Sequence, residues 1–197
     1  DWASRTDSDY TLARSKVQIV DFDGATKIKN PANWFANYSA LRTMFVGDVD
    51  FTAASSLSGF FKNDPLLTTI DGMDNWKTSS ITDMSYLFSA IGANALGGLD
   101  KWDVSNVTDM NHLFYNSTNL NSFGGNGIAG WDTSNVTNFS RMFQSTSALT
   151  DFSTMVKDWD VTSASSTSGS GLSYMFNSSG VTNLVIEWDI PYTAEVT

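Results

Sequence analysis

The carboxylates are the first side chains in this sequence that could do chemistry, because Asp oxygens at alternate positions can bind calcium. No stretch shows the full Asp-x-Asp-x-Asp-Gly loop with a distal Glu, and the chain has only two Glu, Glu187 and Glu195. We therefore predict no cofactor and no metal site, although calcium stays open at three fragments of such a loop. These fragments are Asp21-Phe-Asp23-Gly, Asp48-Val-Asp50 and Asp71-Gly-Met-Asp74.

Other catalytic side chains are scarce. His112 is the single His and Cys is absent, so the residues for a Ser–His–Asp triad, a Cys nucleophile or a thiolate-bound zinc are missing. A glycosidase needs only two carboxylates, but spacing singles out no pair. The stretch 125–130 matches a dinucleotide-binding motif formally, yet Trp131 and a polar turn follow it rather than a helix. The sequence predicts a protein without enzymatic activity.

Composition excludes further classes of protein. The 197 residues carry 11 Lys and Arg against 21 Asp and Glu, and this net charge of −10 repels nucleic acid and acidic membrane surfaces. No apolar run approaches the roughly 20 residues that span a bilayer. An aromatic content of 13% is too high for a disordered polar chain. We expect a folded, acidic protein whose partner is cationic or neutral.

A repeat positions most of the aromatic residues. The stretches 102–110 and 131–139 are nearly the same, weaker copies begin at Trp76 and Trp159, and an echo begins at Trp188; the tryptophans are 26 to 29 residues apart. A second signature follows each copy and also occurs twice upstream. It consists of one apolar residue, two residues of any type, and then two adjacent apolar residues. It defines about six units, at 41–45, 57–61, 84–88, 110–114, 139–143 and 172–176.

Each unit contains a predicted helix or turn and a predicted strand. The apolar residues of 107–114 are spaced i, i+3, i+6 and i+7, which predicts one face of a short helix capped by Ser105. A polar turn follows, and then an extended segment with apolar residues three apart. Stacked units would each add one strand to a parallel sheet. These extended segments are 67–70, 96–99, 120–123, 149–152 and 181–184.

The Trp-Asp-(Val/Thr)-Ser-Asn-Val-Thr-x-Met motif, with its following Met-Phe or Leu-Phe pair, resembles the BspA-like bacterial leucine-rich-repeat family. The DUF285-type repeats of that family occur in surface proteins of lactobacilli, Listeria, enterococci and mycoplasmas. The resemblance implies an α/β leucine-rich-repeat solenoid with short parallel strands and short helices or turns. It also implies an extracellular, non-catalytic region for adhesion or ligand binding.

We expect an N-terminal cap over 1–40, a solenoid of about six coils of 26–29 residues over 41–189, and a C-terminal end over 190–197. The aromatic residues that recur at equivalent positions are interpreted as buried rows, although an exposed tryptophan row would bind sugars or peptides. The repeated Ser and Asn, and the Asp after each Trp (Asp103, Asp132 and Asp160), are interpreted as turn residues. The predicted structural residues are Trp76, Trp102, Trp131, Trp159, Phe88, Phe114, Phe143 and Phe176.

The expected function is adhesion, in which an extended concave face contacts a host or bacterial surface protein or glycoprotein, or a glycan. Two alternatives stay open: a passive stalk or spacer, which should lack an exposed apolar patch, and a carbohydrate-binding module with a tryptophan ladder. We expect a secreted or wall-attached bacterial protein, with targeting and anchoring segments outside this stretch. The predicted binding residues are Thr69, Asp71, Asp100, Ser122, Asp151, Ser153 and Asn183.

Overall fold

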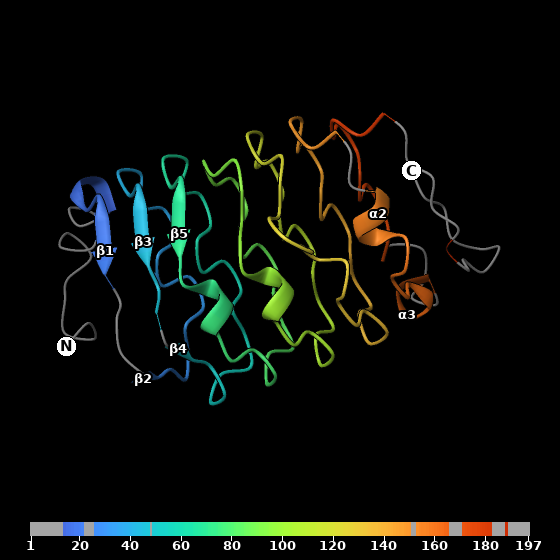
Figure 1. Ribbon diagram of the computed structural model, residues 1–197, viewed down its shortest axis with the longest axis horizontal. Coiled ribbons are helices and arrows are strands. Elements are labelled where there is room, and N and C mark those ends of the chain that lie inside the picture. The colour runs from blue at the N-terminus through green and yellow to red at the C-terminus, as the bar shows by residue number, and fades with distance from the viewer. Residues whose placement is uncertain are drawn as a thin grey trace.

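The computed structural model describes residues 14–21, 26–47, 49–150, 153–165, 171–182 and 188. Successive stretches of the chain lie side by side as coils, in chain order from one end of the molecule to the other (Figure 1). Within the described residues the regular elements are short, and no helix has the length and apolar character to cross a membrane. Residues 14–16 are helical, and the helices whose bounds are fully described are η2 (Met73–Asn75), η3 (Leu99–Lys101), α2 (Ser153–Val156) and α3 (Thr162–Ser165).

The strands come from successive coils and pair in parallel. A three-stranded sheet has the order β1–β3–β5, and β2 pairs with β4 in a second sheet. Of the segments predicted as strands, 67–70 overlaps β5, whereas 96–99 leads into η3 and 120–123 contributes only the bridging residue Ser122. The strands are β1 (Ile19–Asp21), β2 (Thr26–Lys27), β3 (Thr43–Phe45), β4 (Val49–Asp50) and β5 (Thr69–Asp71).

The predicted helix over 107–114 is wrong, because the backbone there makes successive turns. His112 and Asn116 have φ angles of 55° and 57°, in the left-handed region that no right-handed helix contains. Alternate N–H groups of this segment donate to the next coil instead of to the preceding helical turn. The donors at 110, 112, 114 and 116 reach the carbonyls of 138, 140, 142 and 144.

The same pair of left-handed residues, four positions apart, recurs six times in the described part of the chain and therefore marks the repeat of the backbone. The first described pair, Asn33 and Asn37, lies before residue 41, within the segment predicted as an N-terminal cap. Strand β1 likewise pairs with β3 as the later strands do. The pairs are 33 and 37, 59 and 63, 86 and 90, 112 and 116, 141 and 145, and 174 and 178.

Two rows of aromatic side chains run through the core along the stack. Consecutive Phe rings from Phe61 to Phe176 have centroids 5.4 to 5.8 Å apart and nearly parallel planes. Trp76 stacks on Trp102 at 5.3 Å, and Trp131 on Trp159 at 6.1 Å. The interpretation as buried rows is confirmed for these four tryptophans, which are at most 5% exposed, and for Phe88, Phe114 and Phe143, which are fully buried, whereas Phe176 is only partly buried.

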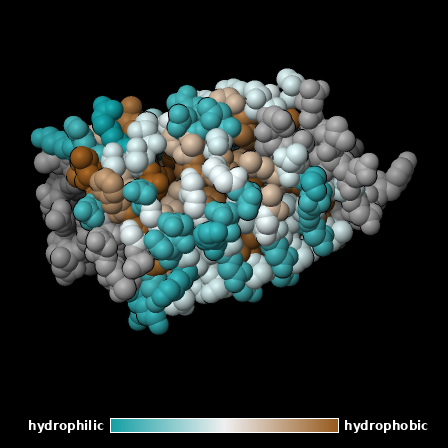
Figure 2. Space-filling model, in the orientation of Figure 1, coloured by the Kyte–Doolittle hydropathy of each residue, from teal (hydrophilic) through white to brown (hydrophobic). Residues whose placement is uncertain are grey.

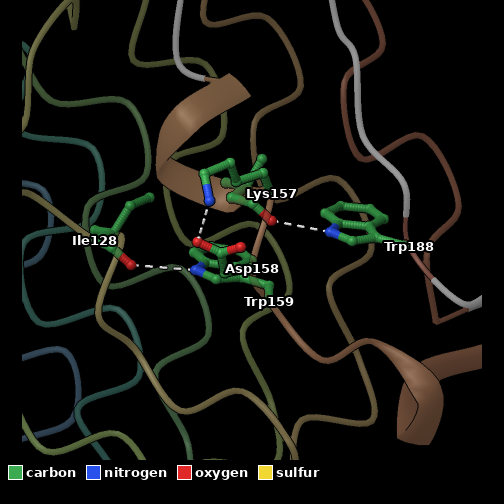
Figure 3. A network of polar contacts seen from close by, with 6 residues as sticks. Ile128, Lys157, Asp158, Trp159 and Trp188 are labelled. Atoms are coloured by element: carbon green, nitrogen blue, oxygen red, sulfur yellow. Dashed lines mark hydrogen bonds and ion pairs between the residues drawn. The ribbon is translucent and has the colours of Figure 1, made fainter.

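Each buried indole donates its N–H to a backbone carbonyl of the preceding coil. Trp102 Nε1 reaches the Met73 carbonyl at 2.8 Å, and the backbone N–H of Trp76 donates to the same oxygen at 3.2 Å. Trp159 and Trp188 make the equivalent bonds to Ile128 and Val156, at 3.1 and 2.9 Å (Figure 3). A buried indole N–H without a hydrogen-bond partner would be destabilising. A tryptophan can therefore recur in the core only because an acceptor carbonyl recurs with it in the preceding coil.

One carboxyl group lies in the core. Asp64 is fully buried; the Tyr38 N–H donates to its Oδ1 at 2.6 Å, and its Oδ2 has no hydrogen-bond partner. Burial raises the pKa of Asp64 to about 8, against the opposing effects of the Tyr38 hydrogen bond and the Arg14 charge. Later coils place Ser117 and Thr146 at this position, and both hydroxyls donate to backbone carbonyls.

We predict that Trp102→Phe lowers the free energy of unfolding by about 1–2 kcal/mol, because the bond to the Met73 carbonyl is lost and the smaller ring leaves a gap. Urea denaturation followed by circular dichroism measures the change. Trp34→Phe is the matched control, since Trp34 is 43% exposed, and we expect a change within about 0.5 kcal/mol. Equal destabilisation by the two substitutions would contradict the role of the indole bond.

The raised pKa of Asp64 predicts stability that falls with rising pH. The folded state keeps the proton up to about pH 8, whereas the unfolded state loses it near the ordinary value of 3.8. Between these values Asp64 lowers the free energy of unfolding by at most about 1.4 kcal/mol per pH unit, and above pH 8 the effect levels off.

Urea denaturation from pH 4 to pH 9 tests this, with Asp64→Ser as the variant because Ser occupies the equivalent position in a later coil. We expect Asp64→Ser to lose most of the decline seen in the wild type, whereas Asp74→Ser at an exposed position should keep it. Parallel stability curves for the wild type and Asp64→Ser would contradict the buried, protonated carboxyl.

Candidate binding surface

Two of the predicted binding residues lie together on the sheet. Thr69 and Asp71 are exposed at the two ends of β5, with the half-buried Ile70 between them. This alternation follows from the strand, in which successive side chains point to opposite faces. The side chains beside the inward Ile70 therefore point outward, as the sequence predicts.

Of the other predicted residues, the described Asp100 and Ser122 are not joined to these by a continuous row of strands. Asp100 is exposed in η3, where its carboxylate lies 3.0 Å from Lys101 Nζ. Ser122 is half-buried, and its Oγ accepts the Gly124 N–H at 3.2 Å. Asp151 and Asn183 lie outside the described residues, as does the side chain of Ser153, the first residue of α2.

The parallel register extends the exposed side of β5 across β3 and β1. Thr69 lies beside Thr43 and Thr43 beside Ile19, while Asp71 lies beside Phe45 and Phe45 beside Asp21. The middle residues of the strands point inward, and Met44 is fully buried. We define the strand face as the outward residues of these strands, namely Ile19, Asp21, Thr43, Phe45, Thr69 and Asp71.

The strand face combines exposed apolar groups with carboxylates. Ile19 is 64% exposed and Phe45 42% exposed, and Figure 2 shows hydrophobic residues gathered over β1 and β3. Phe45 has a carboxylate neighbour on each side, Asp21 on β1 and Asp71 on β5. Neighbouring parallel strands are about 4.8 Å apart, so both carboxylates border the ring.

Sequence reasoning missed Ile19, Asp21 and Phe45 as surface residues. The sequence did contain a signal for Phe45. Leu41 and Met44 are three residues apart, as Leu67 and Ile70 are, and this spacing makes Phe45 equivalent to Asp71. The signal for β1 was weaker, since its segment carries no copy of the Trp motif.

The Asp after each Trp is a turn acceptor, as predicted. Asp132 Oδ1 accepts both the N–H and the hydroxyl of Ser134, and Asp160 does the same for Thr162. The hydroxyl bond is the main reason that the pKa of each of these two carboxyls is lowered. Among the described residues, no three His, Cys, Asp or Glu side chains lie close enough together to hold a metal ion.

The repeated Asn side chains satisfy backbone groups, as predicted, and a repeated Thr does the same, whereas the hydroxyls of Ser105 and Ser134 donate to the carboxylates of Asp103 and Asp132. Asn135 Nδ2 donates to the Ser105 carbonyl of the preceding coil at 2.8 Å, and Asn106 makes the equivalent bond to Ser79. Thr137 Oγ1 donates to the Thr108 carbonyl at 3.0 Å. These hydrogen bonds between side chains and backbone carbonyls hold neighbouring coils together.

Coils joined by backbone hydrogen bonds, a continuous aromatic core and an exposed strand face define a repeat protein with a candidate interaction surface. The chain belongs to the family described as Mycoplasma protein of unknown function, DUF285, whose model matches residues 26–122 and 55–188. No curated protein and no solved structure matches the chain. Since the family description gives no function, the surface has to supply the argument.

Proposed function

We propose that this chain is an extracellular binding domain of a BspA-like bacterial surface protein, built as a leucine-rich-repeat solenoid, and that it adheres to a protein partner through its strand face. The observation that carries this proposal is the exposed Phe45 between Asp21 and Asp71. Binding by such a face requires no bond making or breaking, so the proposed activity is non-catalytic.

The apolar part of the strand face supports association with another protein. Ile19 and Phe45 lie on adjacent paired strands, and their exposed area would be removed from water by a partner. An aromatic anchor with polar groups around it is the usual composition of an interface centre. The hydroxyls of Thr43 and Thr69 would lie beside this anchor as hydrogen-bonding groups.

The charges of the strand face indicate the chemistry of the partner. The carboxylates of Asp21 and Asp71 flank the ring and favour Lys or Arg on the opposing surface. The net charge of −10 adds a long-range attraction to a basic partner, which salt screens. The partner surface we propose therefore combines apolar side chains with Lys or Arg.

The two alternatives are less well supported by this surface. A passive spacer needs no adjacent exposed apolar residues, whereas Ile19 and Phe45 are exposed on neighbouring strands. A carbohydrate-binding tryptophan ladder needs accessible indole faces, whereas Trp76, Trp102, Trp131 and Trp159 are at most 5% exposed.

The test is an array of purified matrix and cell-surface proteins and glycans, probed with the labelled chain at low and high salt. We expect binding to at least one basic protein, weakened by salt. Phe45→Ser should weaken it roughly tenfold or more because the anchor is removed. Asp71→Asn should weaken it less and reduce its salt dependence.

Two controls remove a similar group away from the strand face. Leu66→Ser changes a side chain that is 39% exposed, and Asp158→Asn changes an exposed carboxylate; neither should alter binding. The proposal fails if no arrayed protein is bound, or if Phe45→Ser and Leu66→Ser have the same effect.

A further inference from the structure

A row of aromatic and cationic side chains crosses the coils on the segment of paired left-handed turns, apart from the strand face. Lys62 Nζ lies 4.1 Å from the centre of the Tyr86 ring, and Tyr86 stacks on His112 with centroids 4.4 Å apart. We call this row the stripe; its members are Lys62, Tyr86, His112, Tyr115, Arg141 and Tyr174.

The stripe continues over the later coils. Tyr115 packs edge-on against His112 at 5.1 Å, and Arg141 Cζ lies 5.1 Å from the centre of the Tyr174 ring. Arg141 and Tyr174 are exposed, and the other members are half-buried. The row therefore forms an accessible surface that runs along the stack.

The backbone beneath the stripe favours smaller residues than those it carries. Tyr86, His112, Arg141 and Tyr174 all have φ angles of 55° to 59°, at a position that Asn33 and Gly59 occupy in the first two coils. Gly and Asn adopt this conformation at little cost, whereas larger side chains are strained there. The packing of the coils does not explain four large polar side chains at this position, and a role at the surface does.

The stripe carries two cationic side chains on an acidic protein. Lys62 and Arg141 have permanent charges, while Asp83 and Asp109 lie on bridged segments three residues before Tyr86 and His112, and Asp109 opposes the effect of the two cations on His112. The backbone N–H and the side-chain N–H of Asn111 both donate to the Asp109 carboxylate. Burial, and then the charges of Arg141 and Lys62, lower the pKa of His112, which favours its uncharged ring.

We propose that the stripe binds an anionic polysaccharide lying along the stack of coils. Lys62 and Arg141, which are separated along the stack by three coils or about 14 Å, would pair with acidic groups of the polymer. The faces of the Tyr86 ring are covered by Lys62 and His112, so a sugar cannot stack on them. The stripe instead offers the edges of its rings, with their hydroxyl and N–H groups. A polysaccharide presents hydroxyls and acidic groups at the regular spacing of its sugar rings, and these match polar ring edges better than the apolar side chains of an acidic peptide do.

This proposal is independent of the proposed function, because it uses another segment of each coil and a ligand of opposite charge. Loss of binding in the stripe variants would leave binding through Phe45 unchanged, and the reverse also holds. Failure of one proposal can therefore be told apart from failure of the other.

The test is isothermal titration calorimetry of the full chain with polygalacturonate, which carries carboxylates, and with heparin, which carries sulfates. Neutral dextran and poly-glutamate are the comparison polymers. We expect one or both anionic polysaccharides to bind, with affinity that falls as salt rises. Lys62→Gln and Arg141→Gln should each weaken binding roughly tenfold, the loss expected for a charged hydrogen bond. Lys157→Gln, at an exposed Lys outside the stripe, should leave binding unchanged.

A second variant separates binding from folding. Tyr174→Asn places at this position the residue type that Asn33 has in the first coil, so the unfolding midpoint should stay the same or rise while polysaccharide binding falls severalfold. The proposal is overturned if neither anionic polysaccharide binds, if dextran or poly-glutamate binds as tightly, or if Arg141→Gln behaves like Lys157→Gln.

Discussion

The rest of the structure depends on a backbone carbonyl that accepts two hydrogen bonds in four successive coils, at Met73, Leu99, Ile128 and Val156. The Leu99 carbonyl accepts the N–H of Trp102, which closes a turn in its own coil, and the indole N–H of Trp131 from the next coil. The carbonyl of Ile128 joins Trp131 and Trp159 in the same way. Because the two donors belong to different coils, each such oxygen sets where the next indole lies. The aromatic core can then continue along the stack without an unpaired buried N–H.

Because the coils are equally spaced, residues at equivalent repeat positions form rows along the stack. The backbone conformation of each segment decides which side chains of a row are exposed. On β1, β3 and β5 the alternation of a strand exposes every second residue, and Phe45 lies there between two carboxylates. On the segment of left-handed turns, outward side chains of successive coils form stacked rings with two cations beside them. One acidic chain therefore carries two surfaces of different composition, since neighbouring segments of the same coil expose different repeat positions.

Much of the interior was predictable because it depends on spacing. The tryptophan period, the buried Phe and Trp rows, and Asp132 and Asp160 as turn acceptors all followed from residues that recur at fixed intervals. The helix over 107–114 was wrong although its apolar residues are buried, since a chain of turns with left-handed residues also brings them to one side. The spacing of apolar residues predicts which side chains are buried. It does not predict which acceptors the backbone N–H groups between them bind. The strand face was only half predicted, because Phe45 precedes the first Trp motif.

The sequence by itself determined the repeat, its period and the composition of the core, because each coil must place the same aromatic groups at the same positions to stack. Only the tertiary structure decided which backbone carries them. The N–H groups of 110–116 are satisfied by the following coil rather than within a helix, and that partner exists only once the coils are side by side. The same holds for the surfaces. Asp21, Phe45 and Asp71 are far apart in the chain, and parallel registration of three strands makes them neighbours.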